Sequence, residues 1–187
     1  MKRRHFLINL SAAAVGAAAG ARVHAAGAPG KSIAEIQKDW PTLLAKGADV
    51  AQSTTPITKT EAEWKQSLRE ESFYVLRKDG TERPFTSPLN DEKRAGVFVC
   101  AGCTLPLFSS QMKYDSGTGW PSFFTNIPGH VGTKSDNLLI MTRTEYHCVR
   151  CGGHQGHVFD DGPPPTRQRY CNNGVALKFI PETSAKA

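Results

Sequence analysis

The chain is organised around Cys148-Val-Arg-Cys151-Gly-Gly-His154-Gln-Gly-His157-Val-Phe-Asp160-Asp161, which begins with a C-x-x-C knuckle. A second knuckle lies upstream at Cys100-Ala-Gly-Cys103. Two knuckles indicate a zinc site, because each offers two thiolates from one tight turn to a tetrahedral ion. The long gap between them favours two separate hairpins that the metal holds together. Redox-active pairs or structural disulfides are the alternatives, but glycine in both turns favours the metal.

Cys171 is the fifth cysteine and has no partner among the other four. It lies in Arg169-Tyr-Cys-Asn-Asn173. If this segment is a strand, Arg169 shares a face with Cys171, and a nearby guanidinium favours the nucleophilic thiolate. We therefore expect a reactive thiol, with an inert buried cysteine as the alternative.

His154 and His157 place two imidazoles close to the second knuckle. As metal ligands they would crowd Cys148 and Cys151 and leave the first knuckle without a role. A catalytic or substrate-binding role is favoured, because imidazole exchanges a proton near neutral pH. Ordinary core or surface histidines remain the alternative.

The charge of the chain is unevenly distributed. The formal net charge is +6, from 23 basic and 17 acidic residues, and four of the basic residues precede Ala26. The remaining 19 basic residues nearly balance the 17 acidic ones. This balance gives no support to nucleic-acid binding. A chain of 187 residues is long enough for one domain with a substantial core.

Residues 1–25 are predicted to be a targeting signal. Arg3-Arg4-His5-Phe6-Leu7 is a twin-arginine pattern, and the Ala/Gly-rich run that follows is too short and too weakly apolar to span a membrane. Val23-His-Ala25 supplies a small-residue cleavage site. We expect an exported or periplasmic protein without stable membrane association after the signal is removed. A basic terminus with an alanine-rich linker is the alternative.

Two capping boxes, at Ser32–Glu35 and Thr60–Glu63, predict helices early in the remaining chain. The first should cover roughly 33–40 and stop at Pro41, and the second should end near Glu70. Residues 47–58 are expected to form a loop. Phe73-Tyr-Val-Leu76 is predicted as a strand, followed by a turn at 78–81.

Short runs of strand-forming residues follow from Gly96 onwards. They lie at 97–99, 105–108, 138–142, 144–148, 157–159 and 175–180. Their spacing predicts a mainly β fold, with antiparallel strands in a two-sheet or barrel-like core. Pro163-Pro-Pro165 is expected to form a rigid surface loop. The predicted division is a signal at 1–25, a helix and loop at 26–58, and one domain at 59–187.

The stretch Asp115-Ser-Gly-Thr-Gly-Trp120-Pro-Ser-Phe-Phe124 combines two glycines with an indole and two phenyl rings. It is interpreted as an apolar wall for a small substrate group. A glycine turn that leads into core aromatics is the alternative.

Together these motifs resemble the B-type methionine sulfoxide reductases, which act on the R epimer of the sulfoxide. The resemblance covers about Thr60 to Pro181. It rests on the paired knuckles, Lys113-Tyr-Asp-Ser-Gly-Thr-Gly-Trp-Pro-Ser-Phe123, Cys151-Gly-Gly-His-Gln-Gly-His-Val-Phe159, Asp161-Gly-Pro and Arg169-Tyr-Cys-Asn-Asn173. It implies a mainly antiparallel β fold with N-terminal helices, a structural zinc, and repair of oxidised proteins or peptides that contain methionine sulfoxide.

The resemblance also implies roles for individual residues. Cys171 is the expected nucleophile, and a thioredoxin-like or small-thiol reductant recycles its sulfenic acid. His157, with His154 beside it, is expected to supply a proton to the departing oxygen. The other expected site residues are Arg169, Asn173 and Asp161, with Trp120 and Phe159 at the substrate and Cys100, Cys103, Cys148 and Cys151 at the zinc.

The sequence departs from the family pattern at three positions. Thr118 stands where many members carry a resolving cysteine, and Asn172 and Gly174 replace the usual isoleucine and small polar residue. Two other classes of function stay open. A zinc-ribbon binding module would make no use of Cys171, and a thiol-disulfide oxidoreductase would use a knuckle as its redox pair and hold no stoichiometric zinc.

Overall fold

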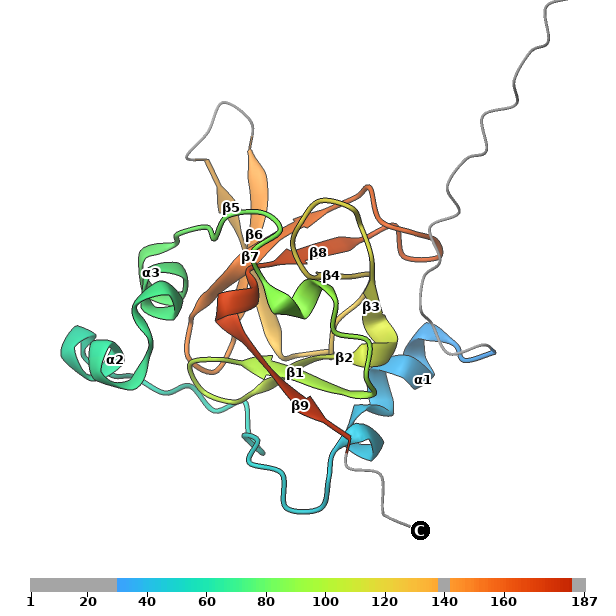
Figure 1. The fold of residues 1–187 in the computed structure, drawn as a ribbon, viewed down its shortest axis with the longest axis horizontal. Helices are drawn as coiled ribbons and strands as arrows, with labels where there is room; N and C mark the ends of the chain where they lie inside the picture. The colour runs from blue at the N-terminus through green and yellow to red at the C-terminus, as the bar shows by residue number, and fades with distance from the viewer. Residues whose placement is uncertain (1–29, 138–141, 183–187) are drawn as a thin grey trace, which may run out of the picture.

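Two antiparallel sheets share one core in the computed structural model, which describes residues 30–137 and 142–182 (Figure 1). The smaller sheet has the order β2 (Pro106–Ser109), β1 (Gly96–Cys100), β9 (Leu177–Pro181). The larger sheet has the order β3 (Lys113–Tyr114), β4 (Ser122–Phe123), β8 (Arg169–Asn172), β7 (His154–Phe159), β6 (Arg143–Cys148), β5 (Val131–Asp136). The predicted fold class is confirmed.

Short helices surround the sheets. They are α1 (Ile33–Lys38), α2 (Glu61–Ser67) and α3 (Glu70–Lys78), with 3₁₀ turns at Trp40–Leu43, Pro88–Asn90, Ser110–Met112 and Gly174–Ala176. Both predicted capping boxes form: the Ser32 hydroxyl accepts from the Glu35 N–H, and Thr60 does the same for Glu63. The first helix ends at Lys38, before Pro41, which lies inside the following 3₁₀ turn.

The strand predicted at Phe73–Leu76 is wrong, because these residues belong to α3. The run looked strand-like because it is short and rich in aromatic and β-branched residues. Over the longer segment, the buried positions Ser72, Val75 and Leu76 have the i, i+3, i+4 spacing of one helical face. Acidic residues in the first turn and basic residues in the last also suit the helix dipole.

Most other strand predictions are confirmed within a few residues. The run predicted at 175–180 begins as a 3₁₀ turn and becomes β9 only at Leu177. Residues 138–141 of the run predicted at 138–142 lie outside the described part of the chain, as does the predicted signal. β5 was not predicted, because Val131-Gly-Thr-Lys-Ser-Asp136 is a mostly polar edge strand. Pro163–Pro165 lie in a loop of turns, as predicted.

A cluster of stacked aromatic rings joins the two sheets. Phe108 of β2 stacks on Phe123 of β4 with ring centroids 4.0 Å apart and planes 7° apart. Phe98 of β1 meets Phe123 edge-on at 5.0 Å, and Tyr146 meets Tyr170 in the same way at 5.2 Å. Burial of each such ring is worth about 1.5–3 kcal/mol. These contacts hold the strands that carry the site in a fixed register.

That register aligns one row of side chains across the larger sheet. Ser122, Cys171, His157, Glu145 and Lys134 are successive Cα partners on β4, β8, β7, β6 and β5. Direct partners in antiparallel strands project from the same face. Cys171 and His157, 14 positions apart in sequence, are therefore neighbours.

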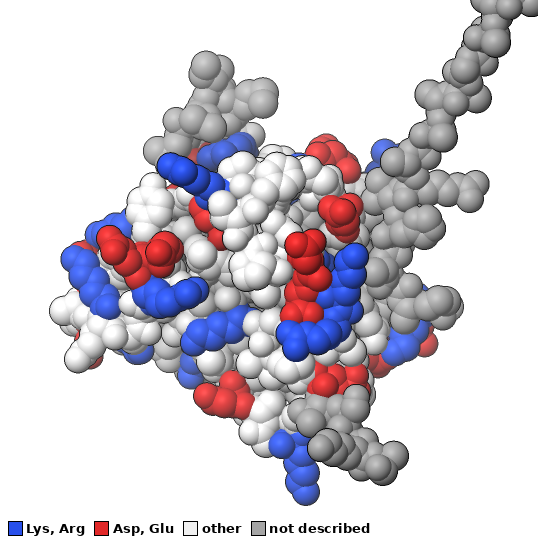
Figure 2. All heavy atoms as spheres, in the orientation of Figure 1, with Lys and Arg blue, Asp and Glu red and all other residues white. Residues whose placement is uncertain are grey.

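The molecular surface mixes both signs of charge. On the face that Figure 2 shows, basic and acidic side chains alternate instead of gathering by sign. Within residues 30–137 and 142–182, none of the helices has the length and apolar character needed to span a membrane.

Candidate functional site

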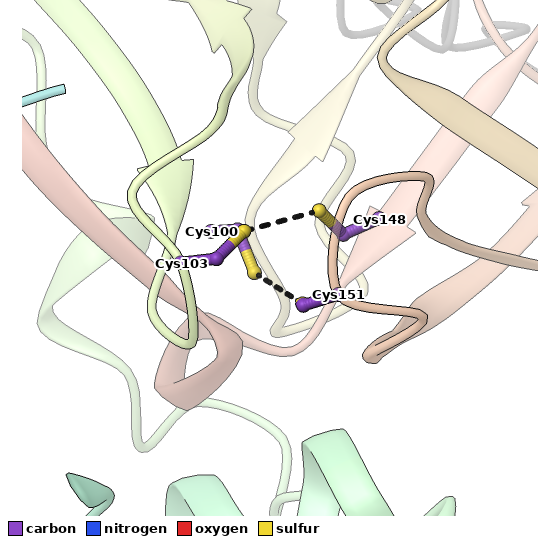
Figure 3. A group of neighbouring side chains, drawn as sticks. All are labelled: Cys100, Cys103, Cys148 and Cys151. Carbon is purple, nitrogen blue, oxygen red and sulfur yellow. Dashed lines mark hydrogen bonds between the residues drawn. The ribbon is translucent and has the colours of Figure 1, made fainter. Parts of the chain in front are cut away.

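Four buried cysteines from two loops meet at one point (Figure 3). Cys100 ends β1 and Cys103 lies in the β1–β2 connection, while Cys148 ends β6 and Cys151 lies in the β6–β7 connection. Their four sulfurs all lie within 4.8 Å of one another. The hairpin arrangement predicted from the long gap is confirmed.

The distances between these sulfurs distinguish a metal site from disulfides. Cys100 Sγ lies 3.6 Å from Cys151 Sγ, and Cys103 Sγ lies 3.5 Å from Cys148 Sγ. A disulfide needs about 2.05 Å. Four thiolates around a tetrahedral ion with metal–sulfur bonds of about 2.3 Å would have sulfurs about 3.8 Å apart. The four thiols therefore have the donor set and spacing of a metal site, which contains neither His154 nor His157.

Gln155 links this cysteine cluster to the other motifs. Its side-chain amide donates to Cys100 Sγ at 3.3 Å. Its backbone carbonyl accepts from both the backbone N–H and the side-chain amide of Asn173, each at 2.9 Å. The segment that follows Cys171 is thus fixed to a residue that touches the cluster.

Cys171 is half-buried at the wall of a small cavity of about 120 Å³. This cavity brings together five of the predicted site residues: Cys171, His157, Trp120, Phe159 and Asn173. The other lining residues are Thr81, Arg143 and Gly156. A Cβ on Gly156 would lie 2.0 Å from the Cys171 carbonyl oxygen, so glycine is required for the close approach of β7 to β8.

The remaining predicted site residues line neighbouring cavities. Asp161 and Arg169 lie together with Thr118 at a second cavity. His154 lies with Glu145 at a third cavity, which His157 also lines. The structure therefore places His157 between the Cys171 cavity and the buried His154.

Burial raises the pKa of the Cys171 thiol above its ordinary value, and the Arg169 guanidinium and Thr118 hydroxyl only partly oppose this rise. Arg169 acts in the predicted direction, but burial outweighs it. Its guanidinium is also engaged by Asp161 through two hydrogen bonds of 2.7 and 2.8 Å. The resting form is therefore a thiol, and a base must remove its proton before attack.

His157 is the imidazole next to that thiol. Its Nε2 lies 2.7 Å from Asp136 Oδ2, and the same oxygen accepts from Arg143 Nη2 at 2.6 Å. Burial lowers the pKa of His157 below its ordinary value, although Asp136 acts against this shift. The imidazole is therefore neutral near pH 7 and able to accept a proton.

His154 lies behind His157, with ring centroids 5.5 Å apart. It is only 2 % exposed, and its Nδ1 lies 3.1 Å from Glu145 Oε1. Glu145 is also paired with Lys134 at 2.8 Å. His154 thus contacts the back of the site and does not line the Cys171 cavity.

Glu82 holds two lining residues of the cavity in place. Its backbone carbonyl accepts from Trp120 Nε1 at 3.2 Å, and its backbone N–H donates to Asn173 Oδ1 at 3.0 Å. Its carboxylate accepts from the backbone N–H groups of Gly174 and Val175. Glu82, a single residue in the segment after α3, therefore fixes both the indole of Trp120 and the turn after Cys171.

Sequence reasoning missed Asp136, Arg143, Glu82 and Gln155. Gln155 lies inside a recognised motif and could have been considered. The others lie in segments without a distinctive pattern, and only the folded arrangement brings them to the site.

Comparisons with known proteins give one consistent family. Residues 68–181 match the SelR domain. The chain is similar to a peptide methionine sulfoxide reductase MsrB of Agrobacterium fabrum, with 48% identity over 130 residues, 68% of this chain and 96% of the relative. It is 50% identical over 131 residues to an MsrB of Methanosarcina barkeri, 70% of this chain and 92% of the relative. It is 51% identical over 130 residues to an MsrB of Pseudomonas putida, 69% of this chain and 98% of the relative.

Proposed function

The chain belongs to the SelR-domain family, and from this membership we propose that it is a peptide-methionine (R)-S-oxide reductase. It reduces methionine sulfoxide in proteins or peptides to methionine. The observation that carries the mechanism is the pairing of Cys171 with His157 on adjacent strands, at a cavity walled by Trp120 and Phe159.

The reaction begins with proton transfer from the Cys171 thiol to the neutral His157 imidazole. The thiolate then attacks the sulfoxide sulfur, and the imidazolium returns the proton to the sulfoxide oxygen. A bond forms between the cysteine sulfur and the oxygen, while the S–O bond of the substrate and the transient bond between the two sulfurs break, and two electrons pass from the cysteine sulfur to the substrate sulfur. Methionine leaves, and Cys171 becomes a sulfenic acid that keeps the oxygen and the proton.

The cavity accounts for the choice of substrate. The indole of Trp120 and the ring of Phe159 offer apolar surface to the ε-methyl group, which favours a methyl sulfoxide over bulkier or more polar groups. The Phe159 ring is itself covered by the Arg169 guanidinium at 4.3 Å. Asp161 holds Arg169 in that position.

The metal of the cysteine cluster is proposed to be a structural Zn²⁺. Four thiolates in closed tetrahedral spacing are the donor set of a structural zinc site, with no open position for substrate. Cys100, Cys103, Cys148 and Cys151 would hold it and join the β1–β2 and β6–β7 hairpins. This assignment disfavours the thiol-disulfide oxidoreductase alternative, since all four knuckle thiols are then engaged.

Recycling is proposed to use an external thiol. With four cysteines at the metal, no second free thiol remains among the five of the chain. The family resemblance puts Thr118 at the position of the usual resolving cysteine, and its hydroxyl lies close enough to lower the pKa of Cys171 through a side-chain contact. A thioredoxin-like protein or a small thiol must therefore reduce the sulfenic acid.

Export through a twin-arginine signal is also part of the proposal. It is supported by Arg3-Arg4 ahead of an Ala/Gly-rich run. Replacement of both arginines by lysine should leave the protein in the cytoplasm, as shown by fractionation with a periplasmic marker. Equal export of this variant and the unaltered protein would contradict the signal assignment.

The function is tested by measuring turnover of the separated R and S epimers of a peptide methionine sulfoxide with a dithiol reductant. Only the R epimer should be reduced. Cys171→Ser should abolish turnover while metal analysis still finds one zinc per chain. A non-catalytic zinc-ribbon module would instead show no turnover of either epimer by the unaltered protein.

A further inference from the structure

We propose that Asp136, held by Arg143, is a positioning residue that orients His157 for proton exchange with Cys171. The inference rests on the proposed function and extends it to a residue outside all the motifs quoted above. Asp136 ends β5, the edge strand farthest from Cys171 in the larger sheet.

The hydrogen bond from His157 fixes the state of the imidazole. Its Nε2 lies 2.7 Å from Asp136 Oδ2. A carboxylate oxygen accepts hydrogen bonds, so Nε2 carries the proton of the neutral ring and donates it to Asp136. Nδ1 is then the nitrogen with a free lone pair, and it is the atom that accepts the Cys171 proton. Nucleophile, base and carboxylate thus form a relay in the order Cys171, His157, Asp136.

The carboxylate is itself held in place. The Asp136 side chain is 9 % exposed, and Arg143, its Cα partner on β6, donates to the same Oδ2 at 2.6 Å. Arg143 also lines the Cys171 cavity. The guanidinium pairs with this buried carboxylate, and the carboxylate in turn stabilises the imidazolium that forms during turnover.

Other charged or titratable groups around His157 come from each packed strand. They are Lys134 on β5, Glu145 on β6, His154 on β7 and Cys171 on β8, with Asp79 after α3 at the same cavity as His154. The hydrogen bond of the imidazole goes to Asp136. Loss of the Asp136 charge should therefore change proton uptake by His157 more than loss of a distant charge would.

The first arm of the test measures the tautomer of His157 in the unaltered zinc-bound protein by ¹⁵N NMR of histidine side chains. The resonance is assigned by its loss in His157→Ala. The proton of the neutral ring should be on Nε2. A ring protonated on Nδ1 would overturn the proposal, and this result does not depend on any variant of Asp136.

The second arm compares Asp136→Asn with Asp49→Asn, an exposed carboxylate that lines none of the three cavities described at the site. Asp136→Asn should lower kcat about 10- to 100-fold with little change in KM, a loss no larger than the lower end of the about 10²- to 10⁴-fold contribution of a general acid or base. In the profile of kcat/KM against pH, the acidic limb should move to lower pH, because the carboxylate that favours the imidazolium is lost. Asp49→Asn should leave the rate and the limb unchanged.

A double substitution separates positioning from general support of the fold. In the His157→Ala background, Asp136→Asn should change the rate by less than about twofold, because the residue acts only through the missing ring. Full additivity of the two losses, or an acidic limb that does not move, would refute the proposal. Absence of R-epimer turnover by the unaltered protein would instead refute the proposed function, while the NMR arm would still report on Asp136.

Discussion

Tyr146 and Asn172 form a buried hydrogen bond directly behind the proposed nucleophile. The Tyr146 hydroxyl donates to Asn172 Oδ1 at 2.6 Å, and both residues are fully buried. Asn172 follows Cys171 on β8, so its side chain lies on the opposite face, toward the core. This partner explains how the chain accommodates asparagine where the family resemblance leads us to expect isoleucine.

Tyr146→Phe should lower the free energy of unfolding by about 1–3 kcal/mol, because it leaves a buried amide oxygen without a donor. For a chain of this size each kcal/mol is worth about 2–4 °C. The melting temperature should therefore fall by roughly 2–12 °C. Asn172→Leu alone should cost a similar amount, because it leaves the Tyr146 hydroxyl unpaired. The other contact of Asn172, from its amide to the Asn173 carbonyl, is replaceable, since that carbonyl also accepts from Ala176 N–H.

The double variant should recover most of the loss, because removal of both partners leaves no unpaired polar group. Urea unfolding of the zinc-bound protein, with the two single variants and the double one, gives the coupling energy directly. We expect at least about 1 kcal/mol of coupling. Tyr74→Phe is the matched control, because Tyr74 is 55 % exposed and its loss should change stability by under about 0.5 kcal/mol.

Additive losses in the double variant would refute the reasoning, since they would mean that the two groups do not satisfy each other. A Tyr146→Phe variant as stable as the Tyr74→Phe control would do the same. Turnover per folded molecule should stay within about twofold throughout, because the pair lies on the face of β8 away from the substrate.

Three further predictions concern the cysteines and the pH profile. Cys148→Ser, unlike Cys171→Ser, should yield misfolded protein without zinc. The binding free energy of a structural zinc is about 10–16 kcal/mol, which is comparable to a domain's whole free energy of unfolding of about 5–15 kcal/mol. A Cys148→Ser protein that is folded, metal-free and active would contradict this prediction. In the Thr118→Cys variant, the new cysteine should form a disulfide with Cys171 after one turnover, which mass spectrometry detects. The unaltered protein should instead hold a sulfenic acid that dimedone traps. In the unaltered protein, a disulfide from Cys171 to a knuckle cysteine, with release of zinc, would contradict this prediction. The profile of kcat/KM against pH should be bell-shaped. Activity should fall below the lowered pKa of His157, where the base is already protonated, and above the raised pKa of Cys171, where no proton remains for the sulfoxide oxygen. A fall that begins well between these two pKa values would contradict the roles given to His157 and Cys171.

The sequence alone was sufficient wherever the chemistry is local or the residue type is distinctive. Four thiols in two knuckles predicted the cysteine cluster, because few other side chains bind metal with that spacing. Capping boxes predicted where α1 and α2 begin, because a cap is satisfied within four residues. The closeness of Cys171 and His157 was implied by the family resemblance, and the β7–β8 register confirms it.

Local patterns failed where packing decides. Four residues of α3 looked like a strand, and only the longer buried face identifies a helix. β5 has no apolar alternation to reveal it, because an edge strand need not bury one face completely.

Tertiary structure alone determined the electrostatics of the site. Proximity of Arg169 predicted a thiolate at Cys171, but the pKa of a thiol also depends on how much water the fold removes from it, and burial dominates here. Asp136 reaches His157 because β5, β6 and β7 are paired in one register, which carries a carboxylate across 21 positions of sequence. Burial and cross-strand register depend on contacts between distant segments, so the carboxylate beside His157 could be identified only in the folded protein.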